Sequence, residues 1–239
     1  MDIKPYKYLS MIYDADWGPF AERYADFVLS HIDVKRTKNM HMLDLACGTG
    51  VLAMKLSPRV ASVLGIDHSR EMIEIARSKV SRRKNVAFKC GDMRRLKCKL
   101  KFDLCTCSFD SINYILTYSD LLSVFRRVYD CLIDGGLFIF DSNTEVHYTT
   151  FNGMSFCRET KIGQVTQSVR YVPSRKRNIV TFNFPGGRCE KHIQRPYNLH
   201  ELTPRLKKAG FKIMSKCRSM KCDRYTARAQ RIFIVAKKV

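Results

Sequence analysis

One segment restricts the folds open to this chain more than any other, because it joins an apolar run to two closely spaced glycines. Residues 41–45 form an apolar run of strand length, Gly48 and Gly50 follow, and a helical pattern begins at Val51. Glycines at such a turn let the backbone approach a ligand, and the following helix offers its free N–H groups. The segment therefore predicts a strand, a turn and a helix that together bind a nucleotide-like ligand.

The same alternation of apolar runs and helical patterns continues to about residue 141. Helices are expected at 20–31, at 51–56, after a cap at Ser69 and at 121–132. Further strands are expected at 61–66, 85–89, 102–107 and 137–140. Strands separated by helices imply a parallel sheet, and continuously apolar strands fit a sheet that helices cover on both faces.

Residues beyond 150 follow a different pattern, with short strands separated by glycine and proline turns. Four strands are expected at 155–162, 164–172, 179–184 and 188–193, and a helix at 199–209 and two strands at 211–214 and 231–236 follow. We predict an α/β, Rossmann-like, doubly wound fold with a mostly parallel seven-stranded sheet and an inserted small antiparallel β subdomain. The expected parts are a cofactor-binding core with an N-terminal helix at 1–146, a lid or substrate subdomain at 147–198, and the completion of the core sheet at 199–239.

The net charge of +21 is concentrated in the later part of the chain. Residues 79–239 hold 33 Lys/Arg against 12 Asp/Glu, and 79–101 and 205–238 are the most basic stretches. Such an excess attracts anions, so RNA or another polyanion is a candidate partner. A solvated basic surface without a specific partner explains the same charge, and we favour that interpretation.

The ten cysteines include no Cys-x-x-Cys pair with the usual spacing of zinc ligands. Several lie in apolar runs, so we expect reduced cysteines that pack as small hydrophobic residues, and we expect no metal. No apolar run approaches the ~20 residues that span a membrane, and the N-terminus lacks the regions of a secretory signal. We therefore expect a soluble, cytoplasmic protein, and nothing in the sequence specifies an oligomeric state.

An acidic residue ends the second expected strand. Asp67 lies 17 residues after Gly50, and a carboxylate at that place can accept hydrogen bonds from both hydroxyls of a ribose. Gly48, Gly50 and Ala53 also fit the looser dinucleotide-binding pattern of glycines. The residues alone therefore indicate a nucleotide-type ligand and leave its identity open.

A series of motifs, in order, resembles class I S-adenosylmethionine-dependent methyltransferases. The matching segments are Asp44–Gly50, Gly65–Ser69 with Met72, Gly91–Met93, Ser108–Tyr114, Gly135-Gly136 and Ala209–Phe211. Within this class the chain is most similar to small-molecule methyltransferases of the glycine N-methyltransferase and sugar-amine N,N-dimethyltransferase type, which also carry an antiparallel insertion after the fifth strand.

The resemblance implies S-adenosylmethionine as cofactor and S-adenosylhomocysteine as product. The residues that it places near the cofactor are Tyr13, Trp17, Asp44, Ala46, Cys47, Gly48, Gly50, Asp67, His68, Met72, Gly91, Asp92, Met93, Ser108 and Phe109. Asp67 would hold the ribose and Gly91–Met93 would flank the adenine. For several of these a plain structural role stays open, such as a turn at Gly91-Asp92 and an ordinary surface position for His68.

Candidate catalytic residues follow the fourth strand, at the carboxyl edge of the sheet where ligands bind. They are Asp110, Asn113 and Tyr114, together with His147 at the start of the insertion. A capping role for Asp110 and a packing role for His147 explain these residues equally well.

The sequence therefore predicts methyl transfer to a small-molecule amine or hydroxyl by in-line displacement, with alignment of the reactants as the main catalytic factor. A methyltransferase acting on RNA or another polyanion is the alternative. An NAD-binding oxidoreductase or a non-catalytic nucleotide-binding module is a further alternative.

Overall fold

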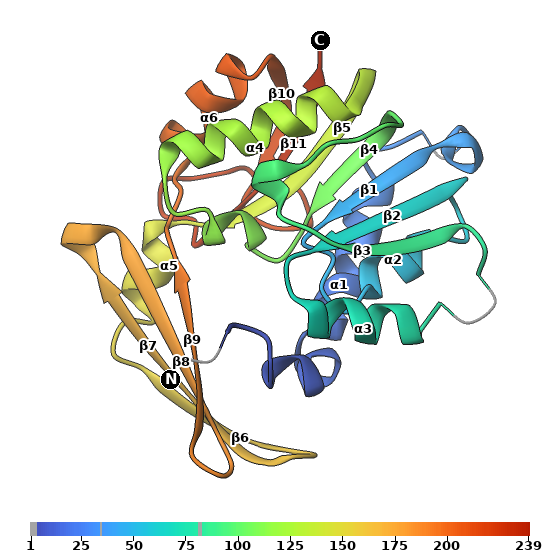
Figure 1. Cartoon of the computed structure of the whole chain (residues 1–239). Coiled ribbons are helices and arrows are strands. Elements are labelled where there is room, and N and C mark those ends of the chain that lie inside the picture. The colour runs from blue at the N-terminus through green and yellow to red at the C-terminus, as the bar shows by residue number, and fades with distance from the viewer. Residues whose placement is uncertain (1–3, 34, 81–82) are drawn as a thin grey trace.

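A seven-stranded sheet forms the centre of the computed structural model, which describes residues 4–33, 35–80 and 83–239 (Figure 1). Its strands lie in the order β10-β11-β5-β4-β1-β2-β3. They are β1 (His41–Leu45), β2 (Ser62–Asp67), β3 (Val86–Cys90), β4 (Phe102–Cys107), β5 (Leu132–Asn143), β10 (Phe211–Cys217) and β11 (Arg231–Lys238). The first five are parallel, and β11 pairs antiparallel with both β5 and β10, which confirms the predicted sheet.

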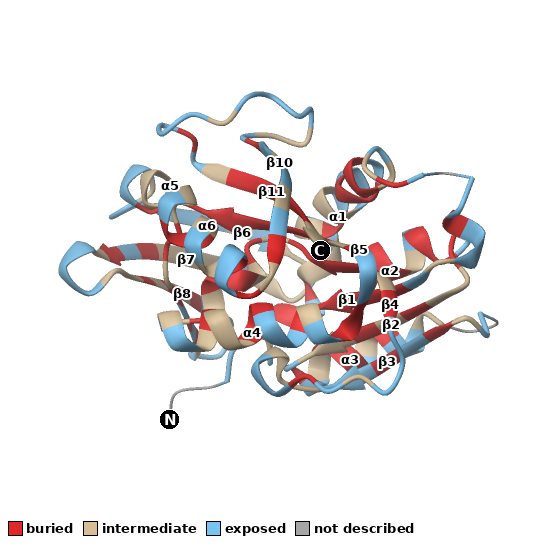
Figure 2. Cartoon of the chain, turned by 90° about the horizontal axis from the view of Figure 1, so that it is seen from above, coloured by how far each residue is buried: buried red, intermediate tan, exposed pale blue. Residues whose placement is uncertain are grey.

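Helices cover both faces of this sheet, and the buried residues concentrate between the helix layers (Figure 2). On one face lie α1 (Tyr13–Leu29), α2 (Val51–Leu56) and α3 (Arg70–Ser78), and on the other lie α4 (Tyr118–Cys131) and α6 (Leu199–Lys208). Ser69 caps α3 as predicted, since its side chain accepts the N–H of Met72. Shorter helical segments are α5 (Glu145–Thr150) and the 3₁₀ turns η1 (Leu9–Met11), η2 (Thr37–Asn39), η3 (Met93–Arg95), η4 (Ser111–Tyr114) and η5 (Pro173–Arg175).

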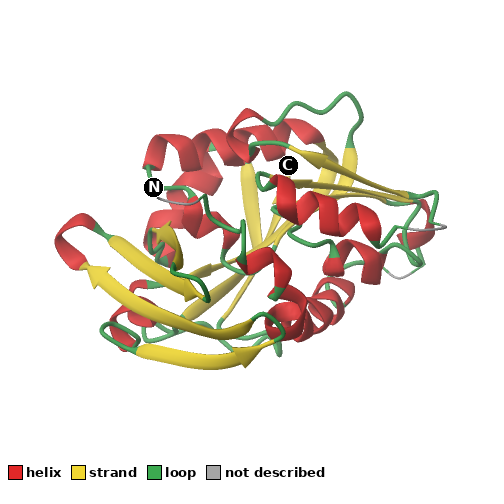
Figure 3. Ribbon diagram, turned by 60° about the horizontal axis from the view of Figure 1, so that its bottom comes forward, coloured by secondary structure: helices red, strands yellow, loops and turns green. Residues whose placement is uncertain are grey.

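A second sheet is inserted between β5 and α6 and forms its own layer (Figure 3). Its four antiparallel strands are β6 (Ser155–Thr160), β7 (Gly163–Val172), β8 (Arg177–Phe184) and β9 (Arg188–Gln194). The predicted antiparallel insertion is therefore confirmed. The proposed division at residues 146 and 198 stays a prediction, and α5 crosses the first of these positions.

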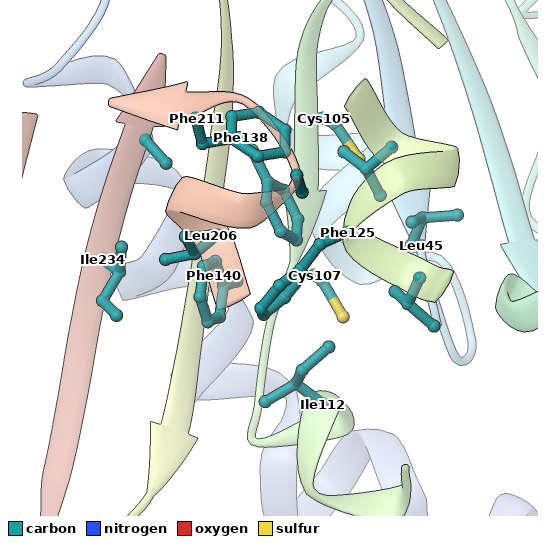
Figure 4. Packing of buried hydrophobic residues seen from close by; sticks show 14 of the residues in the cluster. Leu45, Cys105, Cys107, Ile112, Phe125, Phe138, Phe140, Leu206, Phe211 and Ile234 are labelled. Carbon is teal, nitrogen blue, oxygen red and sulfur yellow. The ribbon is translucent and has the colours of Figure 1, made fainter. Parts of the chain in front are cut away.

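Neighbouring residues of the central strands point to opposite helix layers. Met42 packs with the α1–α3 layer, whereas Leu43 packs with the α4 and α6 layer. Figure 4 shows the layer formed by α4 and α6, in which Phe125 of α4 and Leu206 of α6 lie against Phe138 of β5. These side chains bury the sheet on both faces, and the ends of its strands stay available for ligands.

Three expectations about the elements are wrong in detail. The strand expected at 137–140 begins earlier, because α4 stops at Cys131 and Gly135-Gly136 already lie inside β5, where Gly135 has a φ of +80°. The first long helix begins at Tyr13 and not at residue 20. Cys131 is not reduced, since it forms a disulfide with Cys98 whose Cα atoms are 5.5 Å apart; the two positions are brought together by the contact of η3 with α4.

The most basic stretches border opposite edges of the central sheet. The earlier stretch includes the edge strand β3, and the later one includes the other edge strand, β10. This arrangement gives no single strip of charge along the sheet, and the polyanion partner stays a prediction. In the part of the chain that is described, no helix has the length and apolar character to cross a membrane.

Gly50 offers a test of how tightly the glycine turn is packed. It has a φ of +80°, and a Cβ there would lie 2.5 Å from Cζ of Phe88. We expect Gly50→Ala to lower the free energy of unfolding by about 1–3 kcal/mol, measured by urea denaturation. Gly18→Ala in α1 is the control, because its Cβ would meet no atom within 4 Å and a change below about 1 kcal/mol is expected. Equal effects of the two substitutions would contradict the packing argument.

Candidate active site

The turn between β1 and α2 presents backbone with open space above it. Gly48 has a φ of +54°, and the nearest atom to a Cβ built there would be a ring carbon of Tyr13 at 3.9 Å. Lys79 holds the turn, because its ammonium donates to the carbonyl oxygen of Thr49 at 2.9 Å and pairs with Asp14. Asp14 also accepts the hydroxyl hydrogen of Thr49. A ligand can thus approach Gly48 closely while the turn keeps its shape.

Asp67 connects the ends of β1 and β2. Its two carboxylate oxygens accept the N–H groups of Gly48 and Ser69, each at 2.8 Å. Burial raises the pKa of Asp67 from its usual value, although these N–H groups oppose the shift. Since each carboxylate oxygen has more than one lone pair, further donors such as ribose hydroxyls can still bind.

Asp44 lies at the end of β1 and is completely buried. One of its oxygens accepts the hydroxyl hydrogen of Thr106 at 2.6 Å, and the other, Oδ2, has no partner among the described residues. Burial raises the pKa of Asp44 to about 7. An unpartnered buried carboxylate oxygen beside a glycine turn fits an ammonium group or a bound water. These residues therefore fit the amino-acid and ribose parts of S-adenosylmethionine.

Two cavities meet above the carboxyl end of the central strands. The smaller borders the glycine turn and is lined by Tyr13, Trp17, Gly18, Ala21, Ala46, Cys47, Gly48, Thr49, Val51, Leu52, Ser108, Phe109 and Ser111. The larger, of about 340 Å³, lies under the inserted sheet. Tyr13, Trp17 and Phe109 line both cavities, and the rings of Tyr13 and Trp17 are stacked 5.1 Å apart. These three aromatic side chains thus form a wall that the two cavities share. The smaller cavity is called the cofactor-side cavity below, and the larger one the acceptor-side cavity.

Two residues that line the acceptor-side cavity have buried amide oxygens without partners in the described chain. They are Asn143 at the end of β5 and Asn178 on β8, which are 3% and 1% exposed. Burial of an unpaired carbonyl oxygen is costly, and a ligand N–H or O–H would satisfy it. The rest of the lining is largely aromatic.

A buried ion-pair network lies at the floor of this cavity. The guanidinium of Arg231 donates to Asp110 at 2.9 Å and to Asp141 at 2.6 Å. Gln194 of β9 donates to the second oxygen of Asp110 at 2.7 Å. Burial raises the pKa of Asp141 to about 6, against the opposing effect of Arg231. Since both oxygens of Asp110 are engaged, this residue holds the inserted sheet to the core.

The remaining predicted catalytic residues occupy different environments. Tyr114 and His147 line the acceptor-side cavity, and burial lowers the pKa of His147 to about 4. Asn113 does not line it, because its amide donates to the backbone oxygens of Asn143 and Arg195 at 2.9 and 2.7 Å. Asn113 therefore positions backbone segments and has no free polar atom for a substrate.

Comparisons with known proteins agree with this geometry. Residues 42–136 match the family model described as a methyltransferase domain. The chain is 28% identical over 218 residues to YqeM of Bacillus subtilis (strain 168), which is provisionally named a methyltransferase, and the match covers 87% of each protein. A crystal structure of an S-adenosylmethionine-dependent methyltransferase from Clostridium acetobutylicum ATCC 824 is 26% identical, with a TM-score of 0.74 and coverage of 93% of this chain and 98% of that one.

The protein is an S-adenosylmethionine-dependent methyltransferase. This confirms the predicted enzyme class and favours it over the NAD-dependent alternative. A further relative is the dTDP-4-amino-2,3,4,6-tetradeoxy-D-glucose N,N-dimethyltransferase of Saccharopolyspora spinosa, which is 30% identical over 137 residues, covering 54% of this chain and 52% of that protein.

The predicted cofactor residues of the methyltransferase fall into two groups. Those beside the glycine turn line the smaller cavity, namely Tyr13, Trp17, Ala46, Cys47, Gly48, Ser108 and Phe109. Of those at the ends of β2 and β3, His68 is exposed, Met72 is buried and Asp92 pairs with Arg94 at 2.6 Å. Gly91 donates its N–H to the backbone oxygen of Asp67 at 2.8 Å, so it joins these strand ends. The roles of both groups stay predictions.

Residues that were not predicted as site residues complete the acceptor-side cavity. They are Tyr6, Asn178, Gln194 and Arg231, together with His192, for which the sequence favours a surface or packing role. A signal was present in β9, where Glu190, His192 and Gln194 alternate and so share one face of the strand. Polar residues at alternate positions of a lid strand indicate an inner face that binds something polar.

The raised pKa of Asp44 predicts how stability changes with pH. The folded state holds the proton of Asp44 up to about pH 7, whereas the unfolded chain releases it near the usual value of 3.8. Stability from this group is therefore fully present below about pH 4 and falls by up to about 1.4 kcal/mol per pH unit towards pH 7. We expect Asp44→Asn to flatten this decline in urea denaturation series, and an unchanged slope would contradict the shift.

Proposed function

We propose that this methyltransferase transfers the methyl group of S-adenosylmethionine to an amine or hydroxyl of a small molecule held under the inserted sheet. The observation that carries the proposal is the pair of adjoining cavities with Tyr13, Trp17 and Phe109 in common. One cavity borders the glycine turn and the other borders the lid. With the cofactor in the smaller cavity and the acceptor in the larger one, the methyl group and the nucleophile would meet beside these three side chains.

The chain's own residues would hold the cofactor at the strand ends. Asp67 would accept the ribose hydroxyls, and the glycine backbone at Gly48 would border the amino-acid part together with the unpartnered oxygen of Asp44. Gly91, Asp92 and Met93 would border the adenine. The bound cofactor supplies a methyl group that its sulfonium already activates.

The lid contributes alignment and the exclusion of water. Holding the acceptor in line with the methyl group can supply up to about 7–11 kcal/mol of barrier reduction. Phe109, Trp17 and Phe182 surround the region with apolar surface. No step of this alignment needs a metal ligand or a covalent enzyme intermediate.

The unpartnered amide oxygens of Asn143 and Asn178 favour an acceptor that carries N–H or O–H donors. Asn143 and Asn178 can each accept one such hydrogen bond. The relative from Saccharopolyspora spinosa is named for a deoxygenated amino sugar, whose amine supplies N–H donors. An amine on a sugar ring is therefore the first acceptor class to test.

Two measurements test the proposal. Calorimetry with S-adenosylhomocysteine establishes binding at the glycine turn, and methyl-labelled S-adenosylmethionine with a panel of amines, amino sugars and hydroxylated rings measures transfer. We expect labelled product from at least one small acceptor. Binding without any small-molecule product, together with label transferred to RNA, would replace the proposal by the polyanion alternative.

A further inference from the structure

A chain of hydrogen bonds runs through the wall of the acceptor-side cavity. The hydroxyl of Tyr6 donates to the hydroxyl oxygen of Tyr114 at 2.7 Å, and the Tyr114 hydroxyl lies 2.8 Å from Nδ1 of His192. Nε2 of His192 lies 3.3 Å from the carboxylate of Glu190. Tyr6, Tyr114 and His192 line the cavity, whereas Glu190 lies behind them and is completely buried.

The donors and acceptors of this chain determine where its hydrogens lie. Glu190 accepts the backbone N–H groups of Tyr6 at 3.0 Å, Leu9 at 3.3 Å and Tyr8, so it acts as an acceptor towards His192 as well. Nε2 of His192 must then carry the hydrogen, and Nδ1 has a free lone pair. Because Tyr6 donates to the Tyr114 oxygen, the hydrogen of Tyr114 points to Nδ1 of His192.

We infer that Tyr114, His192 and Glu190 form a proton relay that removes the proton of the methyl acceptor. As the acceptor nitrogen or oxygen bonds to the methyl carbon, the methyl–sulfur bond breaks and sulfur keeps the electron pair. The acceptor proton passes to the Tyr114 oxygen while the Tyr114 hydrogen passes to Nδ1 of His192. The resulting imidazolium is paired with the Glu190 carboxylate and loses its proton to water when the cavity opens. This inference rests on the proposed function.

The surroundings of Tyr114 favour transfer of its proton to His192 during the reaction over a Tyr114 phenolate that forms beforehand. Burial raises the pKa of Tyr114 well above its usual value, and Asp110, Tyr13 and Tyr148 face it with the same effect. Tyr114 therefore needs a base behind it to exchange its proton. On the other side, His192 is packed by Glu190, Tyr6 and the ring of Phe182, and Glu190 is the one carboxylate paired with it in the described chain.

Other candidate bases in the cavity lack such support. Asp110 is held in an ion pair by Arg231 and also accepts a hydrogen bond from Gln194. His147 lines the cavity, but burial lowers its pKa to about 4, and no described side chain forms an ion pair or hydrogen bond with its ring. Of the two histidines that line this cavity, His192 is the one with an oriented partner on each nitrogen.

The hydrogen positions can be tested without an acceptor. We expect ¹⁵N spectra of histidine-labelled protein with S-adenosylhomocysteine to show His192 protonated at Nε2 and unprotonated at Nδ1, with the signal assigned by its loss in His192→Gln. Tyr114→Phe should shift the Nδ1 signal. Tyr171→Phe should not, because its hydroxyl donates to Glu145 at 2.6 Å outside the cavity. A His192 ring protonated at Nδ1 in place of Nε2 would overturn the relay.

Steady-state kinetics of methyl transfer test the catalytic role of the relay. The acceptor is dTDP-4-amino-2,3,4,6-tetradeoxy-D-glucose or, if that gives no product, the first small molecule that the labelled-methyl panel identifies. We expect Tyr114→Phe and His192→Gln each to lower kcat by about 100-fold, with KM and cofactor Kd changed by less than about threefold. Tyr171→Phe should retain the wild-type kcat.

An unchanged kcat in Tyr114→Phe and His192→Gln, or a loss confined to KM, would reject the relay even though methyl transfer itself persists. Failure of the proposed function is distinct, because no small acceptor would then give product while cofactor binding is intact. In that case the nitrogen spectra still decide whether the relay is assembled.

Discussion

Arg231→Met is expected to lower the free energy of unfolding by about 3–5 kcal/mol, because it leaves two buried carboxylates without their cation. Asp110 and Asp141 are 9% and 0% exposed, and both accept hydrogen bonds from this guanidinium. Methionine keeps much of the apolar stem and removes the charge. Urea denaturation at pH 8 measures the effect.

The charge argument has two controls. Arg228→Met removes an exposed arginine from the same segment and should change stability by less than about 0.5 kcal/mol. Adding Asp141→Asn to Arg231→Met should restore part of the loss, since one unpaired carboxylate disappears. The pKa of Asp141 is already about 6, and removal of Arg231 raises it further, so the defect should shrink as pH falls. A defect that is equal at every pH would show that packing, not charge, is lost.

Asp67→Ala is expected to weaken binding of S-adenosylhomocysteine by 1.5–3 kcal/mol, roughly 10- to 150-fold in Kd, because the ribose hydroxyls lose a charged acceptor. The same change removes the acceptor of the Gly48 N–H at 2.8 Å, so the turn loses a support as well. Calorimetry gives the Kd, and circular dichroism checks folding.

Asp67→Asn separates these two effects. Its amide oxygen can still accept the Gly48 N–H, while its NH₂ group can accept neither the Ser69 N–H nor a ribose hydroxyl. We expect Asp67→Asn to bind more weakly than wild type and more tightly than Asp67→Ala. Asp130→Ala, which removes an exposed acid on α4, should leave the Kd unchanged. A wild-type Kd in a folded Asp67→Ala variant would remove the ribose role.

The central sheet could be predicted from the sequence because its strands are apolar on both faces. The runs that became β1 and β4 match the predicted bounds, and β2 and β3 are shifted by one residue. The start of β5 could not be predicted in this way, since Gly135 interrupts the apolar pattern. Leu132 pairs there with Phe102 of β4, and pairing with β11 begins only at Leu137. Local propensity and tertiary pairing disagree there, and the pairing prevails.

The cofactor side of the site was accessible to sequence analysis because its residues follow single strands at short spacing. The acceptor side was not, because its contacts join distant parts of the chain. Arg231 is 121 residues from Asp110 and 90 from Asp141, and Tyr114 is 78 residues from His192. A local sequence pattern does not predict contacts between residues so far apart in the chain. Docking of the inserted sheet on the core brings Tyr114 and His192 together, whereas pairing of β11 with β5 inside the core places Arg231 beside Asp141.

The lining of the two cavities has an evolutionary consequence. No residue of β6, β7, β8 or β9 lines the smaller cavity beside the glycine turn, whereas Phe156, Gln167, Asn178, His192 and Gln194 of these strands line the larger one. On the proposed function, substitutions in the insertion would change which molecule is methylated while the methyl donor continues to bind. Ancestral duplicates of such a chain could acquire new acceptors one strand residue at a time, without passing through a form that has lost its donor.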